Sequence, residues 1–270
     1  MKLGKLLQLA VLAAGLGAFS GAASADALAD IKAANKIRVG IDLGAPFYGY
    51  IDEKMQPVGS DVDAARLLAK DLGVELEIVQ TTNSARIPNL LSNKADLIIS
   101  SLSITPERAK AVDFSIPYGA IQAAVGAPKN LDIKGMDDLA GKTVAVTRGG
   151  PQDKLVSEGA PKAKVVRFDD EAASITAAAS GQADIVAITP PIIHAIGKRN
   201  PEREFEVKFV IQSYQLGVAM RKNEPQLMAW VNDWIRENLN NGKLNEIHLK
   251  YAGVPIPDEI VQGANQAAAK

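Results

Sequence analysis

The sequence contains no cysteine and only two histidines, His194 and His248, among its 270 residues. The lack of thiols excludes disulfides, thiol catalysis and thiolate metal sites, and two imidazoles leave little material for a zinc centre. An excess of charge of one sign is also lacking, since 30 Lys and Arg residues stand against 31 Asp and Glu residues. A near-neutral protein has no broad field for holding nucleic acid or an anionic membrane. We therefore expect no metal ion, no other cofactor and no nucleic-acid partner.

The first 25 residues differ in composition from the rest of the chain. Lys2 and Lys5 precede an apolar stretch over residues 6–19, and small residues follow as far as Ala23-Ser24-Ala25. This pattern is typical of a secretory signal peptide (residues 1–25), with cleavage expected after the final alanine. The apolar stretch is shorter than the roughly 20 residues of a membrane-spanning helix. We expect a protein exported to the periplasm, without direct membrane insertion.

Strands alternate with helices along the remaining chain. Alternating apolar residues over 37–41 predict a strand, and the apolar spacing that follows predicts a helix capped by Ser60 and ended by Gly73. The same alternation recurs over residues 143–188. Ligand sites of α/β proteins lie where the carboxyl ends of strands face the amino ends of helices. Two successive α/β units therefore indicate two lobes with a ligand cleft between them.

The expected crossings between the lobes lie near residues 118–124 and 212–217. Residues 26–119 and 216–270 are expected to form lobe 1. Residues 120–215 are expected to form lobe 2, with hinge strands at both of its ends.

Several stretches resemble the polar amino-acid-binding family of periplasmic solute-binding proteins, which serve ABC importers. The most specific is residues 101–108, where Ser-x-Ser-x-Thr-Pro-Glu-Arg is followed by Asp-Phe-Ser at 113–115. The resemblance spans essentially the whole chain after residue 25. It implies an α/β periplasmic-binding-protein fold, with two lobes joined by two crossing strands. It also implies a monomer that closes on a free amino acid and then docks on a membrane permease. The other matching stretches are residues 39–42, 46–47, 59–63, 86–88, 96–105, 141–144 and 241–244.

Arg108 lies in the first turn of a helix that Thr105-Pro106 is expected to start. A cation is unfavourable there because of the helix dipole, so we expect its guanidinium to face an anion. An ion pair with a surface acid such as Glu107 explains the residue equally well. The resemblance implies instead that Arg108 binds the ligand α-carboxylate and that Ser101 and Ser103 line the same ligand.

Asp42 ends a strand before a Gly-rich turn that carries Phe47. Either its carboxylate receives a ligand ammonium beside an aromatic wall, or it closes an Asx turn with the ring in the core. Asn83 and Arg86 likewise follow a strand end, where Arg86 could be a solvated loop residue. The resemblance implies that Arg86 reads a side-chain carboxylate, as in binders of acidic amino acids. We therefore expect a small polar amino acid with an acidic or amide side chain.

The chain departs from the family pattern at two places. Gly149 begins a turn that resembles an anion cradle, but Pro151 lacks the backbone N–H that at this position helps to hold the ligand carboxylate. Gln152 is either a ligand contact or a plain helix-start residue. Thr189 stands where the family has an aspartate for the α-ammonium, although a helix cap explains a threonine there. Either Asp42 takes over the amine, which we expect, or the ligand lacks a standard α-amino group.

Three functions remain open at this point. The chain is a transport receptor, a receptor that feeds a sensor, or a dehydratase of cyclic amino-acid precursors on the same scaffold. An enzyme needs an acid or base in the cleft. Apart from Asp42, the expected contacts offer no titratable pair, and packing or surface roles suit both histidines better than catalysis. We therefore expect a receptor and no catalytic residue.

Overall fold

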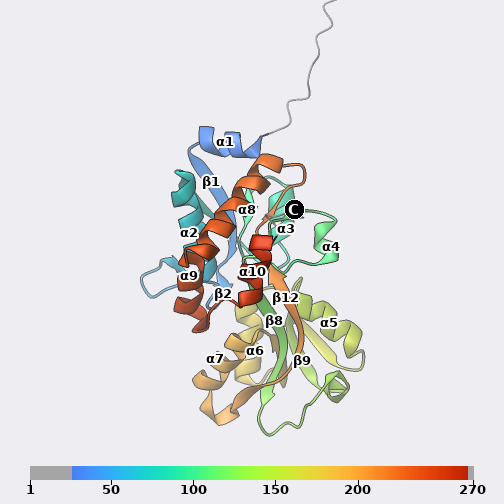
Figure 1. The fold of residues 1–270 in the computed structure, drawn as a ribbon. Helices are drawn as coiled ribbons and strands as arrows, with labels where there is room; N and C mark the ends of the chain where they lie inside the picture. The colour runs from blue at the N-terminus through green and yellow to red at the C-terminus, as the bar shows by residue number, and fades with distance from the viewer. Residues whose placement is uncertain (1–25, 267–270) are drawn as a thin grey trace, which may run out of the picture.

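A computed structural model describes residues 26–266 of the chain (Figure 1). The expected signal peptide, residues 1–25, lies outside this part. The chain forms two lobes, each built on a five-stranded sheet covered by helices. Within the described residues, no helix is long and apolar enough to cross a membrane.

Lobe 1 is built on a sheet with the strand order β5-β1-β6-β13-β7. β5 and β6 run parallel to β1, whereas β13 runs antiparallel to its neighbours β6 and β7. A three-stranded sheet, β2-β3-β4, extends from the end of β1. The strands are β1 (Lys36–Asp42), β2 (Gly44–Ala45), β3 (Gly49–Ile51), β4 (Pro57–Val58), β5 (Glu75–Thr81), β6 (Leu97–Ile98), β7 (Asp113–Phe114) and β13 (Ala219–Met220). The helices are α1 (Ala27–Ala33), α2 (Ser60–Leu72), α3 (Arg86–Leu91), α4 (Pro106–Ala109), α8 (Pro225–Asn240), α9 (Lys243–Ala252) and α10 (Asp258–Gln266).

Lobe 2 is built on a sheet with the strand order β10-β9-β11-β8-β12. β9, β10 and β11 run parallel to one another, and β11 is buried along its whole length, as expected for a parallel strand covered on both faces. The strands are β8 (Gly119–Pro128), β9 (Thr143–Thr147), β10 (Lys164–Phe168), β11 (Ile185–Ile188) and β12 (Phe205–Leu216). The helices are α5 (Pro151–Gly159), α6 (Glu171–Ser180) and α7 (Pro190–Arg199), with 3-10 turns η1 (Met136–Leu139) and η2 (Pro201–Arg203).

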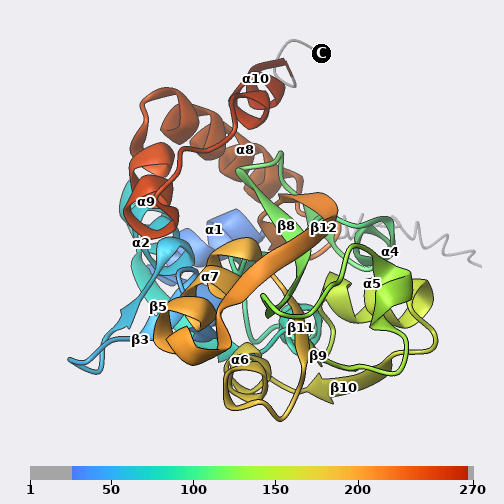
Figure 2. The same cartoon turned by 90° about the horizontal axis from the view of Figure 1, so that it is seen from below.

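Two strands carry the chain between the lobes. β8 and β12 pair antiparallel from Gly119 opposite Leu216 to Pro128 opposite Phe205, and both views show them side by side (Figures 1 and 2). The crossing is therefore a hydrogen-bonded ribbon, with register shifts between Val207 and Phe209 and between Val210 and Gln212. The expected limits of lobe 2, residues 120–215, stay a prediction. We propose them because they fall one residue inside the outer ends of this ribbon.

α2 illustrates how the apolar pattern builds the core of lobe 1. Val62, Ala65 and Leu68 recur at helical spacing and are fully buried against the sheet, where a leucine contributes roughly 1.5–3 kcal/mol. The helix ends at Gly73, whose φ of 77° suits a residue without a Cβ. One detail of the prediction is wrong, since Ser60 is the first helical residue and its side chain makes no capping hydrogen bond.

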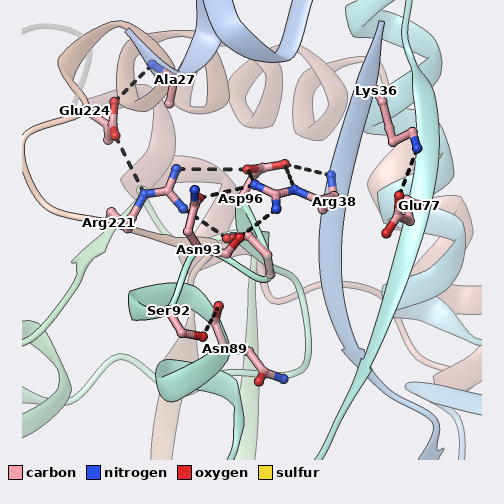
Figure 3. A network of polar contacts seen from close by, with 11 residues as sticks. Ala27, Lys36, Arg38, Glu77, Asn89, Ser92, Asn93, Asp96, Arg221 and Glu224 are labelled. Carbon is pink, nitrogen blue, oxygen red and sulfur yellow. Dashed lines mark hydrogen bonds and ion pairs between the residues drawn. The ribbon is translucent and has the colours of Figure 1, made fainter. Parts of the chain in front are cut away.

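A network of charged groups ties α1 and the start of α8 to the amino ends of the lobe 1 strands (Figure 3). The carboxylate of Asp96 accepts hydrogen bonds from the backbone N–H and the guanidinium of Arg38, the shortest at 2.6 Å. Arg221 bridges Asp96, at 4.0 Å, and Glu224, at 3.8 Å, and Glu224 accepts from the backbone N–H of Ala27 at 3.2 Å. These groups lie at the ends of the strands that face away from lobe 2, so we assign them a role in the stability of the fold.

Candidate ligand-binding site

A small enclosed cavity of about 30 Å³ lies between the lobes. Its walls come from the carboxyl ends of β1, β9 and β11 and from the loops that follow β5 and β6, with two residues of β8 and one of β12 at the hinge. This is the position expected for a ligand site in an α/β protein. The predicted contact residues that line it are Asp42, Asn83, Arg86, Ser101, Ser103, Gln152 and Thr189.

Three predicted contact residues lie outside this cavity. Arg108 and Gly149 border a wider cleft of about 1070 Å³, which meets the cavity at Gly150 and Pro151. The ring of Phe47 packs against the hydrophobic cluster of lobe 2.

From the sequence, Phe47, Tyr48 and Tyr50 were all placed near Asp42 and Phe47 was named as the contact residue, but in the structure Tyr48 lines the cavity and Phe47 does not. The backbone of Phe47 has a φ of 71°, a left-handed turn conformation that is uncommon for an aromatic residue. Both rings pack against the hydrophobic cluster of lobe 2 and border an outer pocket, but only Tyr48 also lines the cavity.

Arg86 is the first residue of α3 and is only 3% exposed, so it is not a solvated loop residue. Its Nε donates to the backbone oxygen of Asn83 at 3.2 Å, and Nη1 donates to the backbone oxygen of Ser100 at 2.7 Å. Nη2 donates to the side-chain oxygen of Asn83. Burial lowers the pKa of the guanidinium, and the surrounding carboxylates oppose this shift. These three bonds leave one N–H on each terminal nitrogen, because a guanidinium has five donors.

Asp42 ends β1 and is 4% exposed. Its Oδ1 accepts from the backbone N–H of Gly44 at 2.9 Å, which is the Asx turn expected as one alternative. Its Oδ2 is buried without a hydrogen-bond partner among the described residues. Burial raises the pKa of Asp42, while the Gly44 N–H and the charge of Arg86 oppose the rise. One oxygen therefore serves the turn, and the other is available to a ligand.

Thr189 precedes α7 and is 2% exposed. Its hydroxyl makes no capping hydrogen bond and has no partner within residues 26–266. Thr105 behaves differently, because its hydroxyl accepts from the backbone N–H of Arg108 at 3.2 Å. Thr189 therefore occupies the N-cap position of α7, as one alternative had it, but its side chain does not cap the helix. Its hydroxyl is instead a buried polar group on the cavity wall, where an unsatisfied group is costly.

Two carboxyl groups of the site were missed from the sequence. Glu171 is the first residue of α6, follows the capping residue Asp170, and lines the cavity half-buried. Burial raises its pKa to about 8, and the negative charge of Asp42 adds to the rise. An acid at a helix start just after a strand was the signal that could have found it.

Asp61 is the second missed carboxyl group and lies behind the cavity. It accepts hydrogen bonds from the hydroxyls of Ser101 at 3.2 Å and Tyr118 at 3.4 Å. Burial raises its pKa to about 7. The side chain of Ser101 is therefore engaged by Asp61, although the residue borders the cavity.

Arg108 joins the lobes at the edge of the cavity. Its guanidinium donates to the backbone oxygen of Ser103 in lobe 1 and to that of Gly149 in lobe 2, both at 2.9 Å. Burial lowers its pKa to about 9, and the nearby charge of Arg86 contributes to the shift. The alternative of an ion pair with Glu107 is wrong, because Glu107 pairs with Lys154 across the cleft at 3.1 Å.

Gly149 is the point of closest backbone approach in this region of the cleft. Its φ of 76° suits glycine, and an added Cβ would lie 2.9 Å from the Cα of Ser84 in lobe 1. Together with the bonds of Arg108 and Lys154, this contact places the two lobes in a closed arrangement.

A family model described as bacterial extracellular solute-binding proteins, family 3, matches residues 37–254. The ABC transporter glutamine-binding protein GlnH of Bacillus subtilis is 30% identical over 232 residues, which cover 84% of this chain and 84% of that protein. Among solved structures, a mutant of ArgBP from T. maritima has a TM-score of 0.78 at 36% identity, covering 84% of this chain and 100% of that chain. The ancestral amino acid-binding protein AncCDT-1, described as a precursor of cyclohexadienyl dehydratase, also has a TM-score of 0.78, at 34% identity, covering 83% and 98%. These matches confirm the family and the two-lobed fold that the sequence predicted. The chain belongs to family 3 of the bacterial extracellular solute-binding proteins.

Proposed function

We propose that this protein binds a free polar amino acid between its lobes and delivers it to the permease of an ABC importer. The relatives support this proposal, since one is a glutamine-binding protein of an ABC transporter and ArgBP has been solved bound to arginine. The observation that carries it is the arrangement of charge around the cavity. Two unpartnered acceptors and the buried Arg86 come from residues of the cavity wall, and Arg108 lies at the cavity edge, so groups suited to both charges of an amino acid are present.

The ammonium site consists of Asp42 Oδ2 and Thr189 Oγ1. Both atoms are buried, both lack a partner among the described residues, and both residues line the cavity from opposite lobes. An ammonium supplies three donors and one positive charge, which would satisfy both oxygens and the charge of the carboxylate. The threonine alone would leave the ammonium without a counter-charge, so Asp42 takes over that role.

The carboxylate site lies at Arg108. This guanidinium spends two donors on backbone oxygens and keeps three others. Arg86 is close enough for its charge to lower the pKa of Arg108. A buried and a half-buried cation that destabilise each other create a place where an anion is stabilising. We assign the ligand α-carboxylate to this place, with Arg108 as its main anchor.

An amide side chain suits the rest of the cavity better than an acidic one. From the sequence, Arg86 was expected to favour a ligand with either an acidic or an amide side chain. In the structure this arginine gives three donors to protein oxygens and stands among the carboxyl groups of Asp42, Asp61 and Glu171. A third charge on the ligand, of the same sign as these groups, would be repelled.

Binding also requires the lobes to open. The contacts of Arg108 with Gly149, of Lys154 with Glu107 and of Gly149 with Ser84 join the lobes beside the cavity, so an amino acid has to enter while the lobes are apart. The β8–β12 ribbon is the hinge on which the lobes move. We further propose that the protein works as a monomer in the periplasm, after cleavage of a signal peptide at Ala25.

Native mass spectrometry of the protein purified without denaturation, followed by calorimetry with each of the twenty amino acids, tests the proposal. We expect a co-purified amino acid and saturable binding of a small group of polar amino acids. The variant Glu202→Gln, an exposed acid of lobe 2, is the control for surface charge. An absence of binding to all twenty would refute an amino-acid receptor. Capture of a sensor in place of a permease by the loaded protein would favour the sensor role.

A dehydratase remains the second candidate because of one observation. Asp42 and Glu171 line the same enclosed cavity and both have raised pKa values, which is the titratable pair that acid–base catalysis needs. The similarity to AncCDT-1 points the same way. Incubation with a cyclohexadienyl amino acid, followed by NMR, distinguishes the two functions. Loss of water from the substrate that depends on Glu171 would establish the enzyme, and an unchanged ligand would favour the receptor.

A further inference from the structure

Glu171 lines the cavity, but neither the ammonium nor the α-carboxylate of a bound amino acid needs it as a partner. The ammonium is accounted for by Asp42 and Thr189, and the α-carboxylate by Arg108. The carboxyl group of Glu171 makes no hydrogen bond or ion pair to any other described residue. The half-buried carboxyl group lines the cavity and is therefore available to a donor on the ligand.

The surroundings of Glu171 are held in place by lobe 1. The charged and titratable groups that face it are Asp42 at the end of β1, Tyr48 after β2, Asp61 in α2 and Arg86 in α3. Asp61 is occupied by Ser101 and Tyr118, whereas Arg86 gives three of its five donors to Asn83 and Ser100 and keeps two. Asp42 and Thr189, whose Oδ2 and Oγ1 atoms are buried and unpartnered among the described residues, line the same cavity. The cavity is therefore built to receive donors, and Glu171 is on its lobe 2 wall.

Building on the proposed function, we infer that Glu171 contacts the side chain of the ligand and makes the cavity selective for an amide. An amide carries both a donor and an acceptor. It can pair with a protonated carboxyl group through two hydrogen bonds, and it can donate to the same group when it is ionised. A charged side chain suits only one of these forms, because an acid needs Glu171 protonated and a cation needs it ionised.

The raised pKa of Glu171, about 8, turns this difference into a measurable pH dependence. As the pH increases above that value, the affinity for glutamate should fall about tenfold per pH unit. As the pH increases toward that value from below, the affinity for arginine should rise by a similar factor per unit. The affinity for glutamine should change by about threefold or less, because the amide suits both forms. Asp61 also titrates near neutral pH, but it lies behind the cavity and should affect all three ligands alike. Measurements should stay below pH 8.5, since the pKa of Arg108 is about 9.

Calorimetry with glutamine, glutamate and arginine at pH 6, 7 and 8 tests the inference on the wild type, Glu171→Gln and the control Glu202→Gln. Because Glu171 is largely protonated over this pH range, we expect Glu171→Gln to bind glutamine and glutamate about as well as the wild type, to lose up to about tenfold for arginine at pH 8, and to remove the differences in pH slope between arginine and the other two ligands. Glu171→Asp, which keeps the acid, should keep those differences, and circular dichroism verifies that each variant is folded. Equal ligand ranking and equal slopes in wild type and Glu171→Gln would overturn the inference. If none of the amino acids binds to the wild type, it is the proposed function that fails.

Discussion

Replacement of Asp42 by asparagine tests the ammonium site directly. Asparagine has the same shape, and its side-chain oxygen can still accept from the backbone N–H of Gly44, so the Asx turn should survive. The change removes the negative charge at Oδ2, the atom that is buried without a partner within the described chain. Effects on binding should therefore report on the ligand ammonium and not on the fold.

The size of the effect follows from the burial of the carboxylate, which is 4% exposed. Removal of one partner from a buried ion pair costs about 3–5 kcal/mol, which corresponds to an increase of the dissociation constant by about 150- to 5,000-fold. Thr189→Val removes only a neutral hydroxyl acceptor. That loss should cost about 1.5 kcal/mol, or roughly tenfold.

The ligand-free protein should respond in the opposite direction. A buried carboxylate with an unpartnered oxygen destabilises the fold, so Asp42→Asn should raise the melting temperature without ligand while it weakens binding. Calorimetry with the amino acid and with its des-amino analogue, together with thermal unfolding, measures both effects. The reasoning fails if Asp42→Asn binds normally and a plain carboxylate competes as well as the amino acid.

Three further outcomes are expected. Arg108→Ala should cost about 3–5 kcal/mol of binding free energy, and Arg108→Lys should restore only part of it, because a point charge does not replace a planar fork. Calorimetry measures this loss, with Lys110→Ala, at an exposed neighbouring residue, as the control. Normal binding by both alanine variants would contradict the prediction. X-ray scattering should show a smaller radius of gyration when ligand is added, and an unchanged radius with tightly bound ligand would exclude closure of the lobes. Stability of the ligand-free protein should fall as pH rises from about 5 to about 8. The pKa values of Glu171 and Asp61 in the folded state are about 8 and about 7, so the folded form binds more protons than the unfolded chain in this range. Melting temperatures that rise over this range would refute the assignment of these two groups.

The positions of strand ends and helix starts could be predicted from the sequence because they depend on local patterns. Arg86 and Thr189 were placed at the cleft for this reason, and both line the cavity. Ser60 shows the accuracy of such patterns, since the helix begins at this residue although Ser60 does not cap it. Local periodicity finds elements well and their exact ends less well.

The direction of individual side chains could not be predicted, because it depends on tertiary packing. Phe47 and Tyr48 are adjacent, and only the left-handed backbone of Phe47 decides which ring borders the cavity. Glu171 was missed since an acid at a helix start usually needs no explanation beyond the helix dipole. The backbone partners of Arg108 lie on different lobes, at Ser103 and Gly149, so no local pattern could reveal them.

The strand order of lobe 1 constrains the sequence of events in folding. β13 lies between β6 and β7, although it is made of residues 219–220 and the chain builds all of lobe 2 before reaching it. β7 therefore cannot join the sheet until about four-fifths of the chain is available. The strands of lobe 2 are contiguous in sequence, from Gly119 to Leu216, so its sheet can form first. Lobe 1 should thus begin as an open half-sheet and should close only when its last strand inserts, with the finished lobe 2 already attached.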